Sequence, residues 1–535
     1  MRRLMAVCGL AALAVGASPV HAFCGFYAGK ADAGLFNEAS QVVVVRDGDR
    51  TVLSMLNDYK GPLREFVLVV PTPTVMKQGQ VRIAERATFD RLDSYSAPRL
   101  AEYHDSNPCT IADGRGLSRP RLDTAALARA KLGERRNDKT ALGVTVEARY
   151  TLGEYDIVSL SATQSNGLET WLRSNGYRMP RGAAAAFKPY INQGMKFFVA
   201  KVNLKEQLKT GYTHLRPLQF AFESEKFMLP MRLGMLNAPP DKEQDLIVYL
   251  LTKNGRVESA NYRTVPLPAN MNLPHFVKPR FAEFYKALFD RQARQEEHRV
   301  VFTEYFWDMA WCDPCAADPL SAQELRNAGV FWVGGDAGTN FQSMLNPSAP
   351  PPPLAQGGSG AQPVVLTRLH LRYTASSFPE DLVFTQTRDR QNWQARYVIQ
   401  NPYQGSVAQC AAELQQADCD ARCTPRVNDV LAGLQTGPRS WLERYQHGSA
   451  SQMQAQCVAS CRAGKQEALT AATRYYQREL PQRLAAEKRT LADLTGWSPA
   501  EIDAMPDARR YSATQASGNG AAARGGVFGW LPPQR

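Results

Sequence analysis

The chain has 535 residues, of which 44% are hydrophobic and 21% are charged, and its mean hydropathy is -0.36. These values exclude a polytopic membrane protein and a chain that is disordered throughout, and they predict a soluble globular protein of about two to four domains. With 63 Lys and Arg against 51 Asp and Glu, the formal net charge is +12.

The first 22 residues have the pattern of a secretory signal peptide. Arg2 and Arg3 form a basic start, residues 4–17 are apolar, and a small-residue cleavage site ends at Ala22. We expect cleavage after Ala22, a mature chain that begins at Phe23, and a periplasmic or secreted location. An uncleaved N-terminal anchor is the alternative, but its apolar run is short for a span of about 20 residues. No other stretch is long and apolar enough, so we expect no transmembrane segment after cleavage.

Residues 23–345 are predicted to form a β-rich α+β body of antiparallel sheet with interspersed helices. The β-branched run at 42–45 precedes Asp47-Gly48, a strong hairpin signal because the favoured turn needs positive φ at its central positions. Pro279 can open a helix with one apolar stripe. The other expected elements are a helix at 167–175 and strands at 51–56, 66–70, 144–150, 155–160, 196–204, 218–223, 227–236, 245–252 and 257–265.

A basic excursion at residues 110–140 interrupts this body. Segment 115–139 contains eight Lys or Arg and few large apolar side chains, so we expect it to be solvated and partly helical. Two interpretations stay open for it: ordinary solvated surface, or an arm that binds anions by long-range attraction.

The sharpest local motif is Trp311-Cys312-Asp313-Pro314-Cys315. Its C-x-x-C spacing resembles the active site of thioredoxin-like oxidoreductases, in which a helix N-terminus lowers the pKa of the first thiol. The next helix start is Ser321-x-x-Glu324, nine residues after Cys312, so Cys312 does not lie at that N-terminus. We therefore predict a structural disulfide or a tight turn, with redox activity of Cys312 and Cys315 as the alternative.

Other candidate chemistry is sparse. Trp307, Trp311 and Trp332 can form a glycan-stacking platform only if their rings are exposed in one groove. The histidines are scattered without the paired spacing of a metal site, so we expect no catalytic residue, no cofactor and no metal ion. The neighbouring carboxylates, which we expect on a solvated rim, are Glu304, Asp308 and Asp313.

Beyond residue 345 the composition changes. Residues 346–363 hold six Pro and three Gly without a charge, which is typical of a linker. Strand patterns return in residues 364–404, which we expect to rejoin the body. Residues 405–505 have helical spacing, and residues 506–535 are rich in Gly, Ala, Ser and Arg and are expected to be disordered.

Four cysteines in the helical region predict two disulfides. Cys419 and Cys423 are four residues apart, as are Cys457 and Cys461, so each pair lies on one face of its helix. Antiparallel packing brings Cys419 near Cys461 and Cys423 near Cys457, which staples a helical hairpin. Binding of a metal ion by four thiolates is the rival, but an oxidising compartment favours disulfides. Cys410 lies about 180° away around a helix and is not expected to join them.

Several phrases occur in order between residues 24 and 404, among them FVLVVPTPTV, GLETWLRSNGY, MKFFVAKVNL, DLIVYLLTKNGRVESANYRTV, AWCDPC and FPEDLVFTQT. Together they resemble the bacterial domain of unknown function 2330 family. The resemblance implies an exported bacterial protein and no established activity, so it carries over no catalytic residue. Cysteines at family positions are Cys24, Cys109, Cys312 and Cys315. On this resemblance, Cys24 and Cys109 are interpreted as a pair.

These observations favour a non-enzymatic envelope protein with a binding or structural role, because strong fold patterning stands beside an absence of convergent polar chemistry. The helical extension suits another envelope protein or an anionic surface glycan, and nucleic acid is not expected as a partner. Two alternatives stay open. One is a periplasmic thiol-disulfide oxidoreductase that uses Cys312 and Cys315, and the other is a glycan-binding module built on the three tryptophans.

Overall fold

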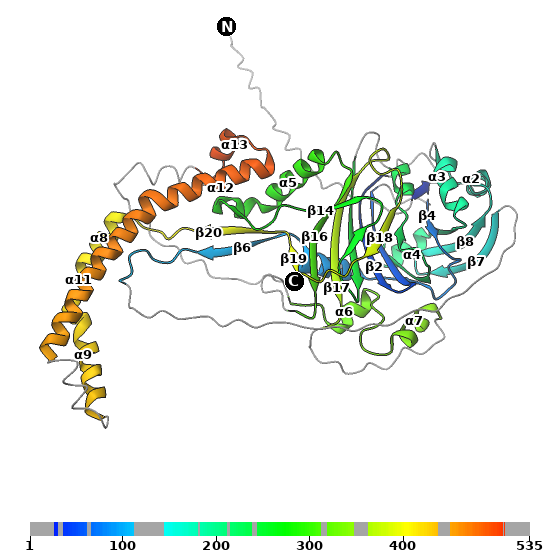
Figure 1. Cartoon of the computed structure of the whole chain (residues 1–535). Helices are drawn as coiled ribbons and strands as arrows, with labels where there is room; N and C mark the ends of the chain where they lie inside the picture. The colour runs from blue at the N-terminus through cyan, green and yellow to red at the C-terminus, as the bar shows by residue number, and fades with distance from the viewer. Residues whose placement is uncertain are drawn as a thin grey trace, which may run out of the picture. The chain divides into compact units, whose positions relative to one another are not determined.

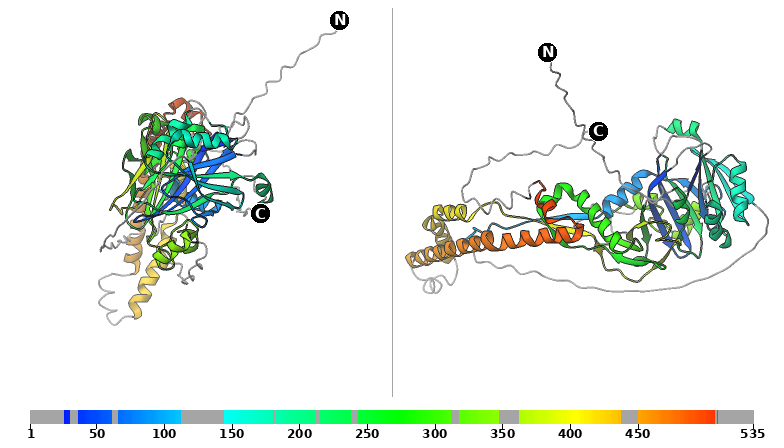
Figure 2. Two further views of the ribbon diagram at one scale, coloured as in Figure 1. Left: turned by 90° about the vertical axis from the view of Figure 1, so that its right-hand side faces the viewer. Right: turned by 90° about the horizontal axis from the view of Figure 1, so that it is seen from above.

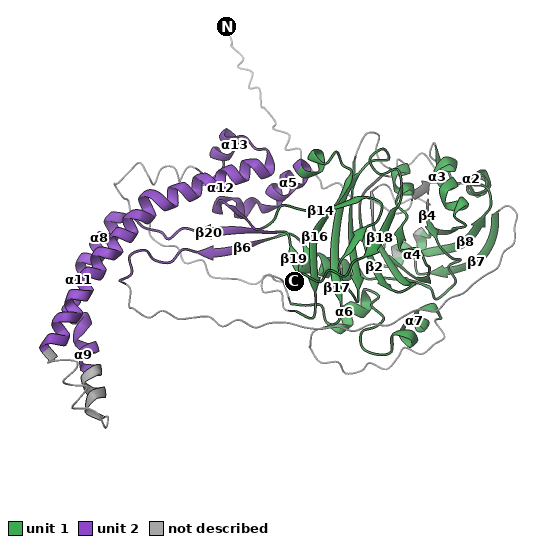
Figure 3. Ribbon diagram, in the orientation of Figure 1, with its two compact units in different colours: residues 1–99, 136–269, 292–395 green, residues 100–135, 270–291, 396–535 purple. Residues whose placement is uncertain are grey.

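The computed structural model describes residues 26–29, 36–60, 66–111, 144–179, 182–210, 215–237, 243–311, 318–346, 362–436, 450–506 and 508. These residues form two compact units (Figure 3). Unit 1 takes its described residues from 1–99, 136–269 and 292–395, and unit 2 takes them from 100–135, 270–291 and 396–535. Unit 2 therefore collects three separated stretches, whereas the sequence suggested consecutive segments.

A nine-stranded sheet is the centre of unit 1 (Figure 1). Its strands are β2 (Phe36–Asp47), β3 (Arg50–Lys60), β5 (Val81–Ile83), β10 (Leu218–Glu223), β12 (Gln244–Thr252), β14 (Arg263–Pro266), β16 (Val300–Asp308), β17 (Val365–Tyr373) and β19 (Trp393–Gln394). The order is β14-β16-β17-β12-β2-β3-β10-β5, with β19 beside β16. Most neighbours are antiparallel, but β12 runs parallel to β2 and β14 runs parallel to β16, so the sheet is mixed.

Two smaller sheets complete the β structure of unit 1. A five-stranded sheet has the order β1-β4-β9-β8-β7, from β1 (Phe26–Gly29), β4 (Phe66–Thr72), β9 (Lys196–Val202), β8 (Tyr155–Ala162) and β7 (Val144–Leu152). A three-stranded sheet joins β11 (Met228–Leu229), β18 (Leu382–Gln386) and β13 (Val257–Ser259).

Strand alternation divides the core of unit 1 into layers. Val42 and Val44 on β2 belong to the cluster that also holds Phe198 of the five-stranded sheet, whereas Val43 and Val45 belong to a cluster on the opposite face. The latter face is covered by α1 (Arg86–Ser96), α6 (Ala322–Asn327) and α7 (Ala337–Leu345). The outer face of the five-stranded sheet is covered in part by α2 (Ser165–Ser174) and α3 (Ala183–Asn192) (Figure 2). Because side chains alternate along each strand, both faces of both sheets can be apolar and buried.

Local sequence signals predicted most turns and helix starts of unit 1. The β2–β3 hairpin turns at Gly48, whose φ is 60°, and α6 begins with the capping box of Ser321 and Glu324. The strand expected at 227–236 is wrong beyond Leu229, because the chain forms the 3-10 helix η1 (Arg232–Asn237). Pro230 has no N–H for a ladder, and Asp381 Oδ1 accepts hydrogen bonds from the next two backbone N–H groups. The remaining helix is α4 (Leu204–Thr210).

Unit 2 combines a small sheet with long helices. The sheet has the order β15-β20-β6, from β15 (Met271–Leu273), β20 (Arg396–Asn401) and β6 (Arg99–His104). The helices are η2 (His275–Arg280), α5 (Phe281–Gln295), α8 (Val407–Gln416), α9 (Cys419–Thr436), α11 (Ala450–Arg474), the π-helical turn η3 (Tyr475–Glu479), α12 (Leu480–Thr495) and α13 (Pro499–Asp503). The apolar stripe expected after Pro279 is confirmed, since Phe284, Leu288 and Phe289 of α5 are buried.

Candidate functional site

The most concentrated chemistry of unit 1 is an ionic network buried in the nine-stranded sheet. Glu304 of β16 is 0% exposed. Its Oε1 lies 2.6 Å from His370 Nδ1, and its Oε2 accepts a hydrogen bond of 2.5 Å from Arg368 Nε. Asp245 of β12 accepts two hydrogen bonds from Arg372, of 2.7 and 2.8 Å. The network therefore joins three neighbouring strands through charged side chains.

The network extends from the sheet to α1. Arg368 Nη1 lies 2.6 Å from Asp93 Oδ1, and the Tyr249 hydroxyl donates to the same oxygen over 3.1 Å. The guanidinium of Arg368 also lies over the Tyr249 ring. A single arginine thus links β16 to the helix that covers this face.

Glu304 points into the covered face of the sheet, where we had expected a solvated rim, and a β-bulge lies at its position. The pairing of β16 with β17 shifts register between Thr303 and Tyr305. The bulge sends the neighbours Glu304 and Tyr305 to the same side of the sheet, where Tyr305 joins the helix-covered core. Asp308 is buried as well and pairs with Arg390. Asp313 lies outside the described residues.

The electrostatics of the network depend on His370. Burial by itself lowers the pKa of this imidazole, but the charges of Glu304 and Asp245 and the hydrogen bond with Glu304 outweigh it, so the pKa is raised above its ordinary value. Burial raises the pKa of Asp245, but the hydrogen bonds from Arg372 and the charges of His370 and Arg372 outweigh it, so this pKa is lowered. With His370 protonated, the three bases of the network balance its three carboxylates.

Sequence reasoning placed Glu304 on a solvated rim and did not identify the network, although a signal exists. Arg368, His370 and Arg372 alternate with Leu369 and Leu371 on a strand that was expected to return to the body. Charged side chains at every second position of a strand within a covered sheet need partners on neighbouring strands. The pattern thus predicts buried ion pairs, but it does not identify Glu304 or Asp245 as the partners.

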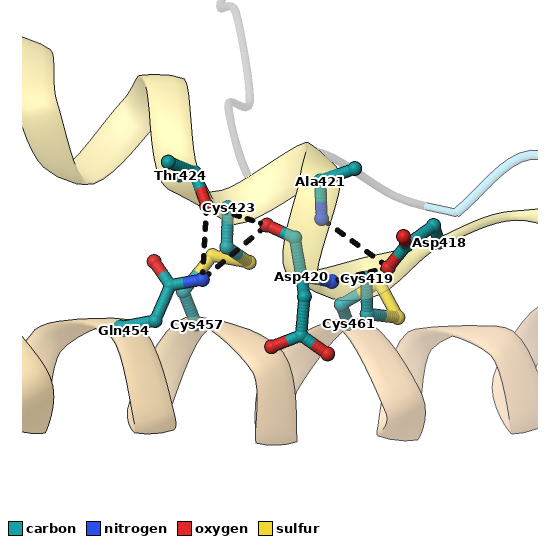
Figure 4. Close-up of a disulfide and its surroundings, with 9 residues drawn as sticks. All are labelled: Asp418, Cys419, Asp420, Ala421, Cys423, Thr424, Gln454, Cys457 and Cys461. Atoms are coloured by element: carbon teal, nitrogen blue, oxygen red, sulfur yellow. Dashed lines mark hydrogen bonds between the residues drawn. A yellow bond between two sulfur atoms is a disulfide. The ribbon is translucent and has the colours of Figure 1, made fainter.

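The predicted disulfide staple is confirmed in unit 2 (Figure 4). Cys419 bonds to Cys461, and Cys423 bonds to Cys457. We call α9 and α11 with these two bonds the stapled hairpin. The rival interpretation as a four-thiolate metal site is wrong, because each of the four sulfurs forms a disulfide.

Polar contacts beside the disulfides fix the start of α9 (Figure 4). The side chain of Asp418 accepts hydrogen bonds from the backbone N–H groups of Asp420 and Ala421, of 2.8 and 3.2 Å, as a helix N-cap does. Gln454 of α11 donates to the Asp420 carbonyl and to the Thr424 hydroxyl, both over 3.3 Å. These contacts hold the two helices in register next to the covalent bonds.

Cys109 bonds to Cys410, so the pairing of Cys109 with Cys24 is wrong. The reason lies in strand order. The segments of β6 and β20 run side by side in the same direction, since Arg99 N–H donates to the Ala395 carbonyl and Asp105 N–H donates to the Asn401 carbonyl. The two segments leave the sheet side by side, and this keeps Cys109 and Cys410 close although they are separated by 301 residues.

Asp105, which follows β6, forms a second polar centre of unit 2. It connects this end of the strand to η3 and α12. Its carboxylate receives two hydrogen bonds from Arg483, of 2.9 and 2.7 Å, and one from the Tyr475 hydroxyl. A pocket of about 400 Å³ lies beside these side chains. Near it, burial raises the pKa of Glu487 to about 7, although the charge of Arg483 acts in the opposite direction.

The three tryptophans do not form one exposed platform. Trp332 is 9% exposed and donates its indole N–H to the Pro363 carbonyl over 3.1 Å. Trp307 donates its indole N–H to the Trp311 carbonyl, and only the Trp311 ring is largely exposed. The condition for a glycan-stacking site on all three rings is therefore not met.

Several predicted features lie outside the described residues. They are the signal peptide at 1–22 with its cleavage site, Cys24, the redox candidates Cys312 and Cys315, most of the basic excursion, most of the linker at 346–363 and most of the tail at 506–535. Within the described residues, every helix is too short or too polar to cross a lipid bilayer. In the same part of the chain, no group of three or more His, Cys, Asp or Glu side chains is arranged to hold a metal ion.

Fold and sites together define a disulfide-containing α+β protein with a β-rich unit and a stapled helical unit. Residues 18–385 match the sequence model of a family described as an uncharacterised protein conserved in bacteria, the domain of unknown function 2330 family. The chain belongs to this family. Neither the curated proteins nor the solved structures contain a match. The matched range includes the whole ionic network, while the stapled hairpin lies beyond it.

Proposed function

We propose that the protein is exported and acts as a non-enzymatic binding protein of the bacterial envelope, with the stapled hairpin as its contact surface for another protein. One observation carries the proposal: this hairpin is held by disulfides with a very small apolar interior. Among the described residues, the cluster around the two disulfides consists of Cys419, Cys423, Cys461 and Val458, with Ile111 and Cys457 packed against it. Such a hairpin keeps its shape without a large core, and its outer surface stays available to a partner.

Export is supported by two independent features. The N-terminal sequence has the basic start, apolar run and cleavage site of a secretory signal. Three disulfides are formed among the described cysteines, and disulfides persist in oxidising compartments. N-terminal sequencing of the protein recovered from the cell envelope or medium should give Phe23 as the first residue. Recovery of uncleaved chain from the cytoplasm with free thiols would overturn export.

The outer surface of the stapled hairpin is suited to protein recognition. Side chains such as Gln456 and Glu467 on α11 are exposed. Binding of a partner there carries little entropic cost of ordering the helices, because the disulfides already hold them in place. Preorganisation of this kind favours a specific contact of modest area.

Charge favours a protein over an anionic glycan as the partner. Residues 405–505 contain eleven Lys or Arg and eleven Asp or Glu, so the helical region is formally neutral. An anionic surface attracts regions with a clear positive excess, and this attraction is the main sequence-independent source of affinity for such surfaces. The helical region offers no such excess.

A non-enzymatic role is supported by the way the ionic network is satisfied. Both carboxylate oxygens of Glu304 already contact charged partners, and both oxygens of Asp245 accept from Arg372. A general acid or base needs an oxygen within reach of a substrate proton. These carboxylates instead hold neighbouring strands together.

Site-specific photocrosslinking in intact cells tests the proposal. A photoreactive residue at Gln456 or Glu467 should give a discrete crosslinked species that contains one partner protein. The matched control is the same residue at Glu223, which is exposed on β10 of unit 1. Equal crosslinking from all three positions, or none from α11, would overturn the hairpin as the contact surface.

A further inference from the structure

A pocket of about 470 Å³ opens on the five-stranded sheet of unit 1, beside α2. Its floor is apolar and comes from three adjacent strands. Val67 of β4, Val158 of β8 and Val199 of β9 line it. Val158 and Val199 are direct cross-strand partners, so the floor is continuous. Val158 is partly exposed at this floor, whereas Val67 and Val199 are buried, so the apolar surface that the pocket offers centres on Val158.

An aromatic wall stands on one side of this floor. Trp171 comes from α2, and Tyr177 follows the helix end. Gly176 has a φ of 85°, which reverses the chain so that Tyr177 N–H donates to the Leu172 carbonyl over 3.0 Å. Trp171 is half-buried, and among the described residues no side chain or carbonyl accepts a hydrogen bond from its indole N–H. The Trp171 ring thus lines the pocket.

The polar rim of the pocket carries a positive excess. Its charged members are Arg149 of β7, Lys201 of β9 and Asp156 of β8. Asp156 lies directly opposite Lys201 in the strand pairing and also accepts a hydrogen bond from Thr151 over 3.2 Å. Within the described part of the chain, no carboxylate pairs with Arg149. An exposed guanidinium above an apolar floor is suited to bidentate binding of a carboxylate.

We propose that this pocket binds a small organic anion with a flat apolar body, of the chemical class of aromatic carboxylates. The ring system would lie on the exposed part of the floor at Val158 against Trp171, and the carboxylate would bind the Arg149 guanidinium. The volume lies in the range of small-molecule sites, and the combination of apolar lining with few polar groups is typical of them. The positive excess disfavours cationic ligands, and the apolar floor disfavours strongly hydrated ones such as inorganic phosphate.

The proposal is independent of the stapled hairpin, and a matched ligand pair tests it. The full-length protein is titrated with 2-naphthoate and with the neutral analogue 2-naphthalenemethanol, by calorimetry and tryptophan fluorescence. We expect saturable one-to-one binding of the acid and at least tenfold weaker binding of the alcohol, because a charge-assisted hydrogen bond is worth about 1.5–3 kcal/mol.

Variants assign the binding to this pocket. Arg149→Gln should weaken naphthoate binding about tenfold or more and leave binding of the alcohol unchanged. Trp171→Leu should weaken both ligands. The control is Lys188→Gln, an exposed charge on α3 that does not line the pocket and should change neither. Arg149 is itself exposed, so its variant should fold even if Trp171→Leu does not. Equal affinity for acid and alcohol, or unchanged naphthoate binding in Arg149→Gln, would overturn the proposal.

Discussion

The nine-stranded sheet of unit 1 and the stapled hairpin of unit 2 solve the same problem of stability in opposite ways. The sheet is apolar on both faces, and most of its buried charges belong to one network, with Arg46 and Asp308 buried apart from it. Among the described residues, the cluster around the disulfides of the hairpin is small and consists of the four cysteines, Val458 and Ile111. A large core can tolerate a buried network because burial elsewhere offsets the desolvation of charges. A thin helical pair lacks that surplus and needs covalent bonds.

The largest expected effect comes from breaking the network. Glu304→Gln leaves Arg368 and His370 without their buried counter-charge, and we expect a loss of about 3–5 kcal/mol in the free energy of unfolding. Denaturant unfolding with hydrogen exchange of the strands of unit 1 measures it. Glu223→Gln, on the exposed end of β10, is the control and should change stability by less than about 0.5 kcal/mol. A loss no larger than that of the control would contradict a stabilising network.

The second prediction breaks the staple. Replacing Cys419, Cys423, Cys457 and Cys461 together by Ser should destabilise α9 and α11 by about 3 kcal/mol, because an unfolded hairpin without cross-links has more conformational freedom. Hydrogen exchange should show lost protection in these two helices, while the nine-stranded sheet keeps its own. The single pair Cys423→Ser with Cys457→Ser should have a smaller effect, since the outer bond still closes the loop. Unchanged protection in the fourfold variant would show that noncovalent contacts suffice.

The third prediction concerns Glu487 of unit 2, whose pKa is raised by burial to about 7 from an ordinary value of 4.5. The folded state therefore holds a proton that the unfolded state releases between these two values, so stability contributed by this group falls as pH rises from about 4.5 to 7. Glu487→Gln should stabilise unit 2 by about 1–2 kcal/mol at pH 8 and have little effect at pH 4. Exchange rates of α12 amides at both pH values check this, and equal effects at both would refute it.

The smallest expected effect concerns the pH dependence of the stability of unit 1. The raised pKa of His370 means that its contribution is fully present below its ordinary pKa of 6.5 and is lost as pH rises through the folded value. Unit 1 should thus lose stability as pH rises above 6.5, and because Glu487 of unit 2 also titrates in this range, the two units must be followed separately. His370→Gln should flatten this dependence in unit 1 only. If the pH dependence of the stability of unit 1 is unchanged in this variant, a group other than His370 causes it.

Much of the fold followed from local signals. The hairpin at Gly48, the helix after Pro279 and the Ser321 capping box each depend on a few adjacent residues, and the structure has all three. The predictions were wrong where a residue distant in the sequence determines the local structure. The segment at 232–237 turns because Asp381 binds its backbone. Glu304 is buried because its face of the sheet is covered and its partners Arg368 and His370 come from β17.

The cysteines separate what the sequence by itself determined from what only the tertiary structure decided. Spacing of four residues on a helix constrains which side chains share a face, so the pairs Cys419–Cys461 and Cys423–Cys457 followed from the sequence. The bond between Cys109 and Cys410 spans 301 residues and depends on β6 lying beside β20. The same holds for the ionic network, whose members come from α1, β12, β16 and β17. Periodicity fixes which face a side chain occupies, whereas strand order and register, set by packing of the whole core, fix what that side chain meets.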